Sequence, residues 1–146
     1  MLVEFEKELI SELKKVHEKT APYLGELENK DEFELLIKGG DEFVFVEFVS
    51  ESYDDKVNKT AVYNVHILSA TSSKQQIYRQ ENKFKAIALC EKIDEELRNL
   101  ELCNEFEITP KSLKVFHNSL TEYGYMYVLT RQIQTKFLKK DEWLEE

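Results

Sequence analysis

FVFVEFV at residues 43–49, followed by TAVYNVHIL at residues 60–68, is the stretch that decides the fold class. In the first segment Phe43 and Phe45 alternate with valines and Phe48, so both faces are apolar. In the second segment, the residues of one face are Ala61, Tyr63, Val65 and Ile67. A repeat of two is that of a β-strand, and apolar side chains on both faces are typical of a strand inside a sheet. We therefore predict two strands, 43–49 and 60–68, with the first of them central.

A longer stretch with the same repeat, YMYVLTRQIQTKF, covers residues 125–137, and Arg131 interrupts its apolar face. Its thirteen residues exceed the usual strand length of about 5–6 residues. Such a strand is expected to protrude or to pair with something outside its own sheet. Before it, the pattern predicts short extended pieces at 106–108 and 113–117 and a turn near Thr121–Gly124.

Two segments have the apolar spacing of a helix. Residues 2–19 carry a stripe at steps of three and four, and Pro22 is expected to end that helix. Residues 82–99 carry a second stripe, formed by Ala86, Leu89, Cys90, Ile93 and Leu97. Residues 26–38 fit either a short helix or an edge strand, and the pattern does not decide between the two.

The order of these elements predicts one α+β domain over residues 1–146. Its sheet is expected to be mixed and mostly antiparallel, with two main helices packed on one face. Polar stretches at 50–59 and 69–80 are predicted as loops, and the second is long enough to suggest a functional role. Residues 139–146 are predicted to form a tail.

The charge of the chain excludes some classes of partner. It has 29 acidic and 20 basic residues, for a formal net charge of -9. Nucleic-acid phosphates and anionic lipids are bound by clustered Lys and Arg, so we expect neither sequence-specific nucleic-acid binding nor membrane binding. The N-terminal residues lack a signal-peptide pattern, and no apolar run approaches the roughly 20 residues of a membrane span. A cytoplasm-like environment is the expectation.

No residue pattern predicts catalysis. His17, His66 and His117 lie in different predicted elements, and none has the spacing of a metal ligand to another His or to Cys. Cys90 and Cys103 form no CxxC motif, and Cys90 is predicted to be a buried, small hydrophobic residue. The GxSxG and HExxH motifs are missing from the sequence, and Gly39-Gly40 is predicted to be a turn. We therefore predict no enzyme activity, no cofactor and no metal.

Tyr123, Tyr125 and Tyr127 alternate in a way that could suggest a platform for stacking nucleic-acid bases. Such platforms lie in positively charged grooves, whereas this chain is strongly acidic. Packing in the core or in an interface is the preferred interpretation of these tyrosines.

The layout resembles the tail terminator proteins of Mu-like phages and related contractile-tail particles, tailocins among them. The likeness is carried by three parts of the chain: the N-terminal helix running into APYLGEL at 21–27, the strand doublet with the helix that ends in CEKIDEEL at 90–97, and the long strand 125–137. The resemblance implies a structural virion-assembly subunit that forms a closed homo-oligomeric ring, typically a hexamer. Such a ring caps the tail tube, stops its polymerisation and offers a docking face for the head–neck connector or the sheath. The protein would occur in the host cytoplasm during assembly and then in the particle.

On this interpretation the partners are the chain itself, the tail-tube protein and the sheath or neck proteins. The contact surfaces are expected at the long strand and at the two polar loops. The candidate interface residues are Tyr53, Lys74, Tyr78, Tyr125, Tyr127, Arg131 and Ile133. Two other functions stay open: an α+β adaptor module that binds a cellular protein through an exposed strand edge, and a small enzyme with a deep polar pocket.

Overall fold

One five-stranded sheet organises the molecule, of which the computed structural model describes residues 1–98, 100–103 and 106–138. The strands are β1 (Thr20–Pro22), β2 (Glu42–Tyr53), β3 (Asn58–Thr71), β6 (Thr109–Thr121) and β7 (Gly124–Leu138), in the order β1-β2-β3-β7-β6. β1 is parallel to β2 and all other neighbours are antiparallel, so the predicted α+β class with a mixed, mostly antiparallel sheet is confirmed. The predicted tail 139–146 and the predicted helix end at Asn99 lie outside the described residues.

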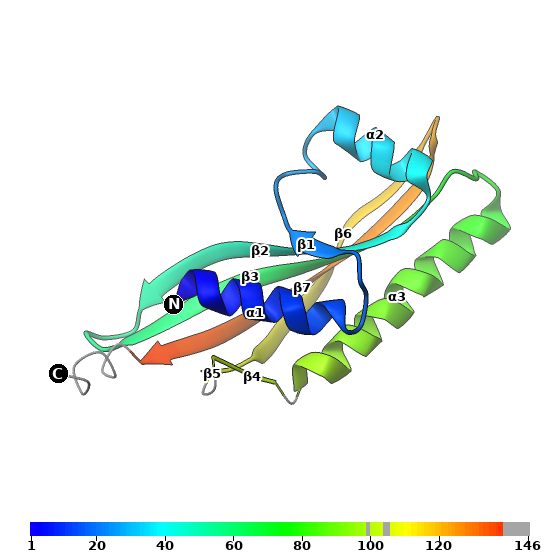
Figure 1. The fold of residues 1–146 in the computed structure, drawn as a ribbon. Coiled ribbons are helices and arrows are strands. Elements are labelled where there is room, and N and C mark those ends of the chain that lie inside the picture. The colour runs from blue at the N-terminus through cyan, green and yellow to red at the C-terminus, as the bar shows by residue number, and fades with distance from the viewer. Residues whose placement is uncertain (99, 104–105, 139–146) are drawn as a thin grey trace.

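Two helices, α1 (Leu2–Lys14) and α3 (Gln76–Arg98), pack on one face of the sheet and enclose the larger core (Figure 1). This core takes Phe5 and Leu9 from α1, Ile93 and Leu97 from α3, and the predicted alternating face of β3. A short hairpin of β4 (Glu101–Leu102) and β5 (Phe106–Glu107) adds two further buried side chains to it. The predicted pair of main helices on one face is therefore confirmed.

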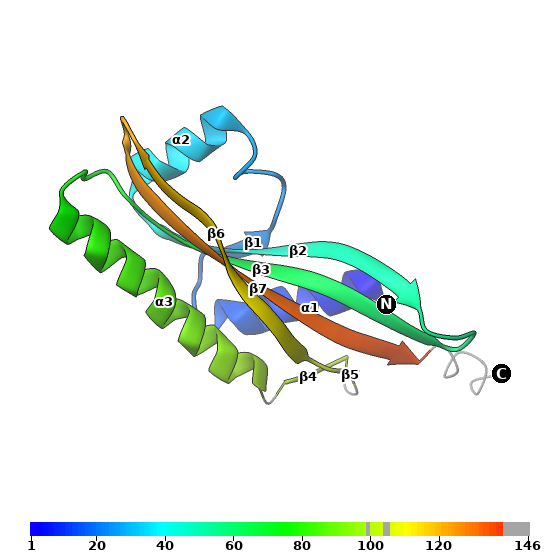
Figure 2. The ribbon, with the colours of Figure 1, turned by 180° about the vertical axis from the view of Figure 1, so that it is seen from behind.

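A third helix, α2 (Lys30–Gly39), lies on the opposite face and covers a smaller core. That core consists of Leu27, Ile37, Phe45, Leu68, Ala70, Met126 and Val128. The Asn29 side chain accepts a hydrogen bond from Glu32 N at 3.0 Å and caps the helix, which explains why the undecided segment 26–38 is helical. Both views place α2 near the end of the sheet that holds the β6–β7 turn (Figures 1 and 2).

The N-terminal helix is shorter than predicted, because it ends at Lys14 and not at residue 19. Residues 20–22 form β1 and pair with Val44, Phe45 and Val46 of β2. The Thr20 hydroxyl donates to the carbonyl of His17 at 2.6 Å, which stabilises the turn between helix and strand. Pairing with the sheet thus overrides continuation of the helix.

Most of each predicted polar loop belongs to a strand or a helix. β2 runs on to Tyr53 and β3 starts at Asn58, which leaves a turn at 54–57 in place of a loop over 50–59. β3 also runs on to Thr71 and α3 starts at Gln76, which leaves 72–75 in place of a loop over 69–80. Ser69 is buried at the start of the second predicted loop and is paired with Asn82 of α3: Ser69 Oγ donates to Asn82 Oδ1 at 2.6 Å, and Asn82 Nδ2 donates to the Ser69 carbonyl at 2.7 Å.

The long strand pairs on both sides within the subunit, so the prediction that it protrudes or pairs with something outside its own sheet is wrong. β7 pairs with β3 from Asn58↔Leu138 to Thr71↔Tyr125 and with β6 on its other side. The β3 strand has 14 residues, and all of them pair with β7, so the backbone of the long strand has its partners inside the subunit. Free edges must therefore be sought on β6 and on β2.

Gly124 provides a test of the packing at the β6–β7 turn. Its φ of +139° suits glycine, and a Cβ built there would lie 2.2 Å from the Thr71 carbonyl oxygen and 3.0 Å from Ile37 Cγ2. Gly124→Ala should lower the free energy of unfolding by roughly 3 kcal/mol or more, through backbone strain and overpacking.

The matched control is Gly39→Ala, since a Cβ at this helical position meets no atom within 4 Å. It should leave stability unchanged or raise it by up to about 1 kcal/mol. Urea unfolding of both variants measures the difference, and equal effects would contradict this packing of the turn.

Candidate functional site

The outer side of β6 is the longest open edge of the sheet. β6 pairs with β7 alone, and no other strand of the described chain pairs with its outer side. Its thirteen residues are mostly exposed. Leu113, Val115, Phe116 and Leu120 are each between 42% and 54% exposed. Proteins usually keep edge strands short, charged or covered, so a long edge with apolar side chains is a candidate for a binding surface.

The first half of β6 carries features that limit unspecific pairing. Pro110 lies near its start, and the register with β7 shifts between Pro110 and Leu113 and again between Val115 and His117. Proline within sheets is confined to edges, strand starts and bulges, so Pro110 was a sequence signal that this strand is an edge. The second half, from His117 to Thr121, pairs with β7 without a shift.

A second open edge lies across the sheet on β2. β1 covers only Val44–Val46, so Glu47–Tyr53 has no strand on its outer side within the described chain. Beside it, α1 and β2 enclose an apolar cavity of about 320 Å³ whose lining includes Val3, Ile10 and Phe48. We call Thr109–Thr121 the β6 edge and Glu47–Tyr53 the β2 edge.

Three of the predicted interface residues lie in the core. Tyr125, Tyr127 and Ile133 belong to the β7 face that packs against α1 and α3, and Ile133 is only 1% exposed. The hydroxyl of Tyr125 donates to the Asn118 side chain of β6. Their side chains stabilise the subunit, and this fold does not present them to a partner.

Arg131, the polar interruption on that face, is bound by α3. Its Nη2 and Nε donate to the two carboxylate oxygens of Asp94 at 2.7 and 3.0 Å, and its Nη1 donates to the Lys111 carbonyl at 2.9 Å. The two-pronged contact raises the pKa of Arg131 and joins α3, β6 and β7 at one point. Arg131 is thus a structural residue in the isolated subunit.

The remaining predicted residues are accessible but do not form one surface. Tyr53 ends β2 with the Lys59 ammonium 5.7 Å from its ring centroid. Lys74 and Tyr78 lie past the opposite end of β3, in the 72–75 connection and at the start of α3. The length of β3, about 45 Å for 14 residues, separates the two groups.

One buried polar group, the imidazole of His66, is paired with side chains of the two neighbouring strands β2 and β7. His66 is buried in β3, with Nε2 2.8 Å from Glu47 Oε1 and Nδ1 2.7 Å from Thr130 Oγ1. Burial lowers the pKa of His117 and raises that of the Cys90 thiol to about 11. Within the described ranges, no three His, Cys, Asp or Glu side chains are grouped to hold a metal, and no helix is long and apolar enough to cross a membrane.

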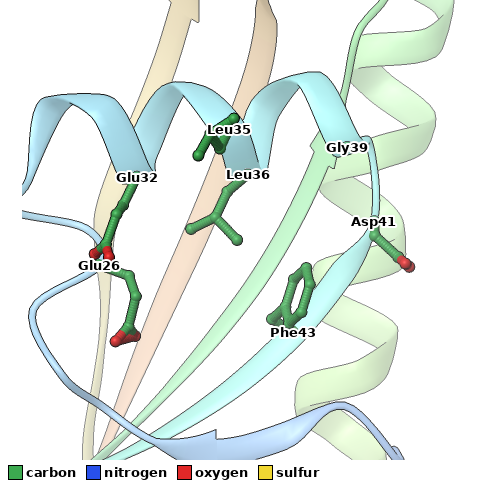
Figure 3. Close-up of a pocket in the computed structure, with 7 residues that line it drawn as sticks. All are labelled: Glu26, Glu32, Leu35, Leu36, Gly39, Asp41 and Phe43. Atoms are coloured by element: carbon green, nitrogen blue, oxygen red, sulfur yellow. The ribbon is translucent and has the colours of Figure 1, made fainter.

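A groove beside α2 is the other concave feature of interest (Figure 3). Its volume is about 320 Å³, and it lies between α2, the loop before that helix and the start of β2. Leu35, Leu36 and Phe43 supply its apolar surface, and Glu26, Glu32 and Asp41 its carboxylates. The groove exists only when residues 30–39 form a helix. The sequence left the secondary structure of 26–38 undecided, so it could not predict this site.

Replacing Arg131 separates a structural role from an interface role. Arg131→Met should lower the free energy of unfolding by roughly 1–2 kcal/mol, because Asp94 and the Lys111 carbonyl lose their donors. Lys85→Met is the control, since Lys85 and Glu81 are both exposed and 3.8 Å apart, and should cost less than about 0.5 kcal/mol. Denaturant unfolding measures both. A changed oligomeric mass for Arg131→Met at unchanged stability would instead indicate a direct interface contact.

A scan against models of protein families and a search of curated proteins found no match to this chain.

Proposed function

We propose that this chain is a structural assembly protein whose copies join by adding the β6 edge of one subunit to the β2 edge of the next. The exposed, apolar β6 edge is the observation that carries the proposal. An unpaired strand of this length has backbone donors and acceptors that a second strand can satisfy, as in recognition by strand addition.

The topology of the sheet supports this pairing in direction. β2, β3, β7 and β6 are joined by three successive antiparallel pairings, so β2 and β6 run in opposite directions. When a neighbouring copy extends the same sheet, its β2 therefore lies antiparallel to β6. Two different edges that meet in this way make a heterologous contact, which closes into a ring when the rotation between copies permits.

The charges of the two edges support the same pairing. Thr109–Thr121 contains Lys111 and Lys114 and no acidic residue, whereas Glu47–Tyr53 contains Glu47 and Glu51 and no basic residue. Each glutamate already has a partner in its own subunit, His66 for Glu47 and Lys59 for Glu51. The charge difference therefore selects which edges meet more than it adds affinity.

The assembly that we propose is the ring at the end of a phage-type tail tube, where it stops polymerisation and offers a docking face to neck or sheath proteins. The resemblance of the layout to Mu-like tail terminators motivates this choice, and the closed heterologous contact is the geometry such a ring needs. A subunit of net charge -9 also suits a ring through which DNA passes without adhering.

Complementation between two edge variants tests the edge-to-edge contact. Val115→Glu with Leu120→Glu places carboxylates on the β6 edge, and Val49→Lys places a cation on the β2 edge. Each variant alone should be monomeric by native mass spectrometry, because one edge of every contact is blocked. Mixed in equal amounts, the two variants should associate again, because the intact β2 edge of the first can pair with the intact β6 edge of the second.

The control is Phe84→Glu on α3, an exposed aromatic residue away from both edges, which should keep the wild-type oligomer. A symmetric contact between two β6 edges predicts a different pattern: Val49→Lys would then stay oligomeric, and the mixture would give no new species. A monomeric wild-type chain would contradict edge-to-edge assembly altogether.

Tube length tests the tail function. Tail-tube subunits polymerised with the wild-type chain should give shorter tubes by electron microscopy, each with a ring at one end, while the β6-edge variant should leave tube length unchanged. Unaltered tubes with an intact ring would contradict the capping role and favour the adaptor, which predicts a cellular partner recovered from a host without phage or tailocin genes.

A further inference from the structure

The groove beside α2 combines an apolar surface with an acidic end. Leu35 is 65% exposed although it lies in a helix that covers a core, and Leu36 and Phe43 are partly exposed beside it. Exposed apolar side chains that gather at a cavity indicate a binding surface more than single ones do.

Two carboxylates lie together at one end of this groove, and both lack a cation. Figure 3 shows Glu26 and Glu32 close to each other, while Asp41 points away from them. Asp41 is paired with Lys19, whereas neither glutamate has an ion pair in the part of the chain that the structure describes. The groove therefore holds uncompensated negative charge next to apolar side chains.

Glu26 is the more constrained of the two glutamates. Its Oε1 accepts a hydrogen bond from Leu24 N at 2.8 Å, while its Oε2 is buried without a hydrogen-bond partner among the described residues. Burial raises the pKa of Glu26, and the charge of Glu32 raises it further. A buried carboxylate oxygen without a donor costs free energy, which a donor from outside the chain would recover.

We propose that this groove binds a protein segment in which an arginine or lysine stands beside a large apolar residue. The cationic group lies between Glu26 and Glu32, and the apolar side chain lies over Leu36 and Phe43. Arginine suits the site best, because its planar guanidinium donates to two carboxylates at once and its methylenes pack on apolar surface. An acidic segment or a phosphate is excluded by repulsion, and a neutral apolar segment would leave both carboxylates buried and unpaired.

This site is independent of the proposed ring contact. The groove lies on the α2 face, whereas the β6 and β2 edges lie at the two sides of the sheet. A segment of a partner protein can therefore bind here whether or not the copies of the chain associate.

Peptide binding by the full chain tests the proposal by fluorescence anisotropy. The probe is a labelled peptide with two arginines, each next to a leucine, among serines; the matched peptide has glutamine in place of each arginine. The arginine peptide should bind, and the glutamine peptide should bind at least about tenfold more weakly, because it leaves the two carboxylates without a cation. Equal binding of the two peptides, or no binding of the arginine peptide, would overturn the proposal.

Variants of the chain locate the binding. Glu26→Gln with Glu32→Gln should weaken the arginine peptide about tenfold, and Leu35→Ser, at an exposed position, should weaken it without unfolding the chain. Glu91→Gln with Glu95→Gln removes the same charge from the exposed face of α3 and should change binding less than about twofold, since distant surface charges are screened. Equal losses in the two double variants would mean general attraction to an acidic protein and would overturn the assigned site.

Discussion

A slip of one residue between β3 and β7 would turn Tyr63, Val65 and Ile67 away from α1 and α3, and the rest of the structure depends on this register being held. The two strands pair over 14 positions without a shift. On the face toward the helices, Tyr63 lies opposite Ile133 and Ile67 opposite Leu129. The exception is Arg131, opposite Val65, and Asp94 of α3 lies where it can bind that guanidinium. Slipped pairing would break this ion pair as well as expose the core.

The helices cover the faces of the sheet and leave its edges open. α1 and α3 cover one face, and α2 covers part of the other, so the central strands are largely buried. The side chains on the outer strand β6 gain much less from this arrangement, since four apolar residues there stay about half exposed. The hydrophobic free energy that remains available is therefore concentrated at an edge, where a further strand can also satisfy the backbone.

The local repeat of the sequence was sufficient to predict the faces of β2, β3 and β7, because side chains alternate along a strand whatever its neighbours are. It was not sufficient for the order of the strands, because that order depends on pairing between segments that are distant in the sequence. The position of β7 inside the sheet is a result of such pairing. Ser69 and Asn82 are polar by any local measure, and only the fold reveals that they satisfy each other. Similarly, Tyr125 and Tyr127 suit a core and an interface equally in the sequence. The β6 edge was partly predictable from Pro110, whereas the groove beside α2 required the helix that local pattern left undecided.

The three residues of β1 have a consequence for any strand added to β2. Thr20–Pro22 already occupies the outer side of Val44–Val46, so an incoming strand can extend only from Glu47 toward Tyr53, a length of about 23 Å. β1 thus acts as a stop that limits how far a neighbour can slide along this side of the sheet. Within one subunit Leu113 of β6 lies level with Val46 of β2, through the pairings across β7 and β3, so copies that pair the residues after Leu113 with Glu47–Tyr53 would be offset along the strand direction. The end of one short strand near the N-terminus would in this way set the stagger between neighbouring subunits in the proposed assembly.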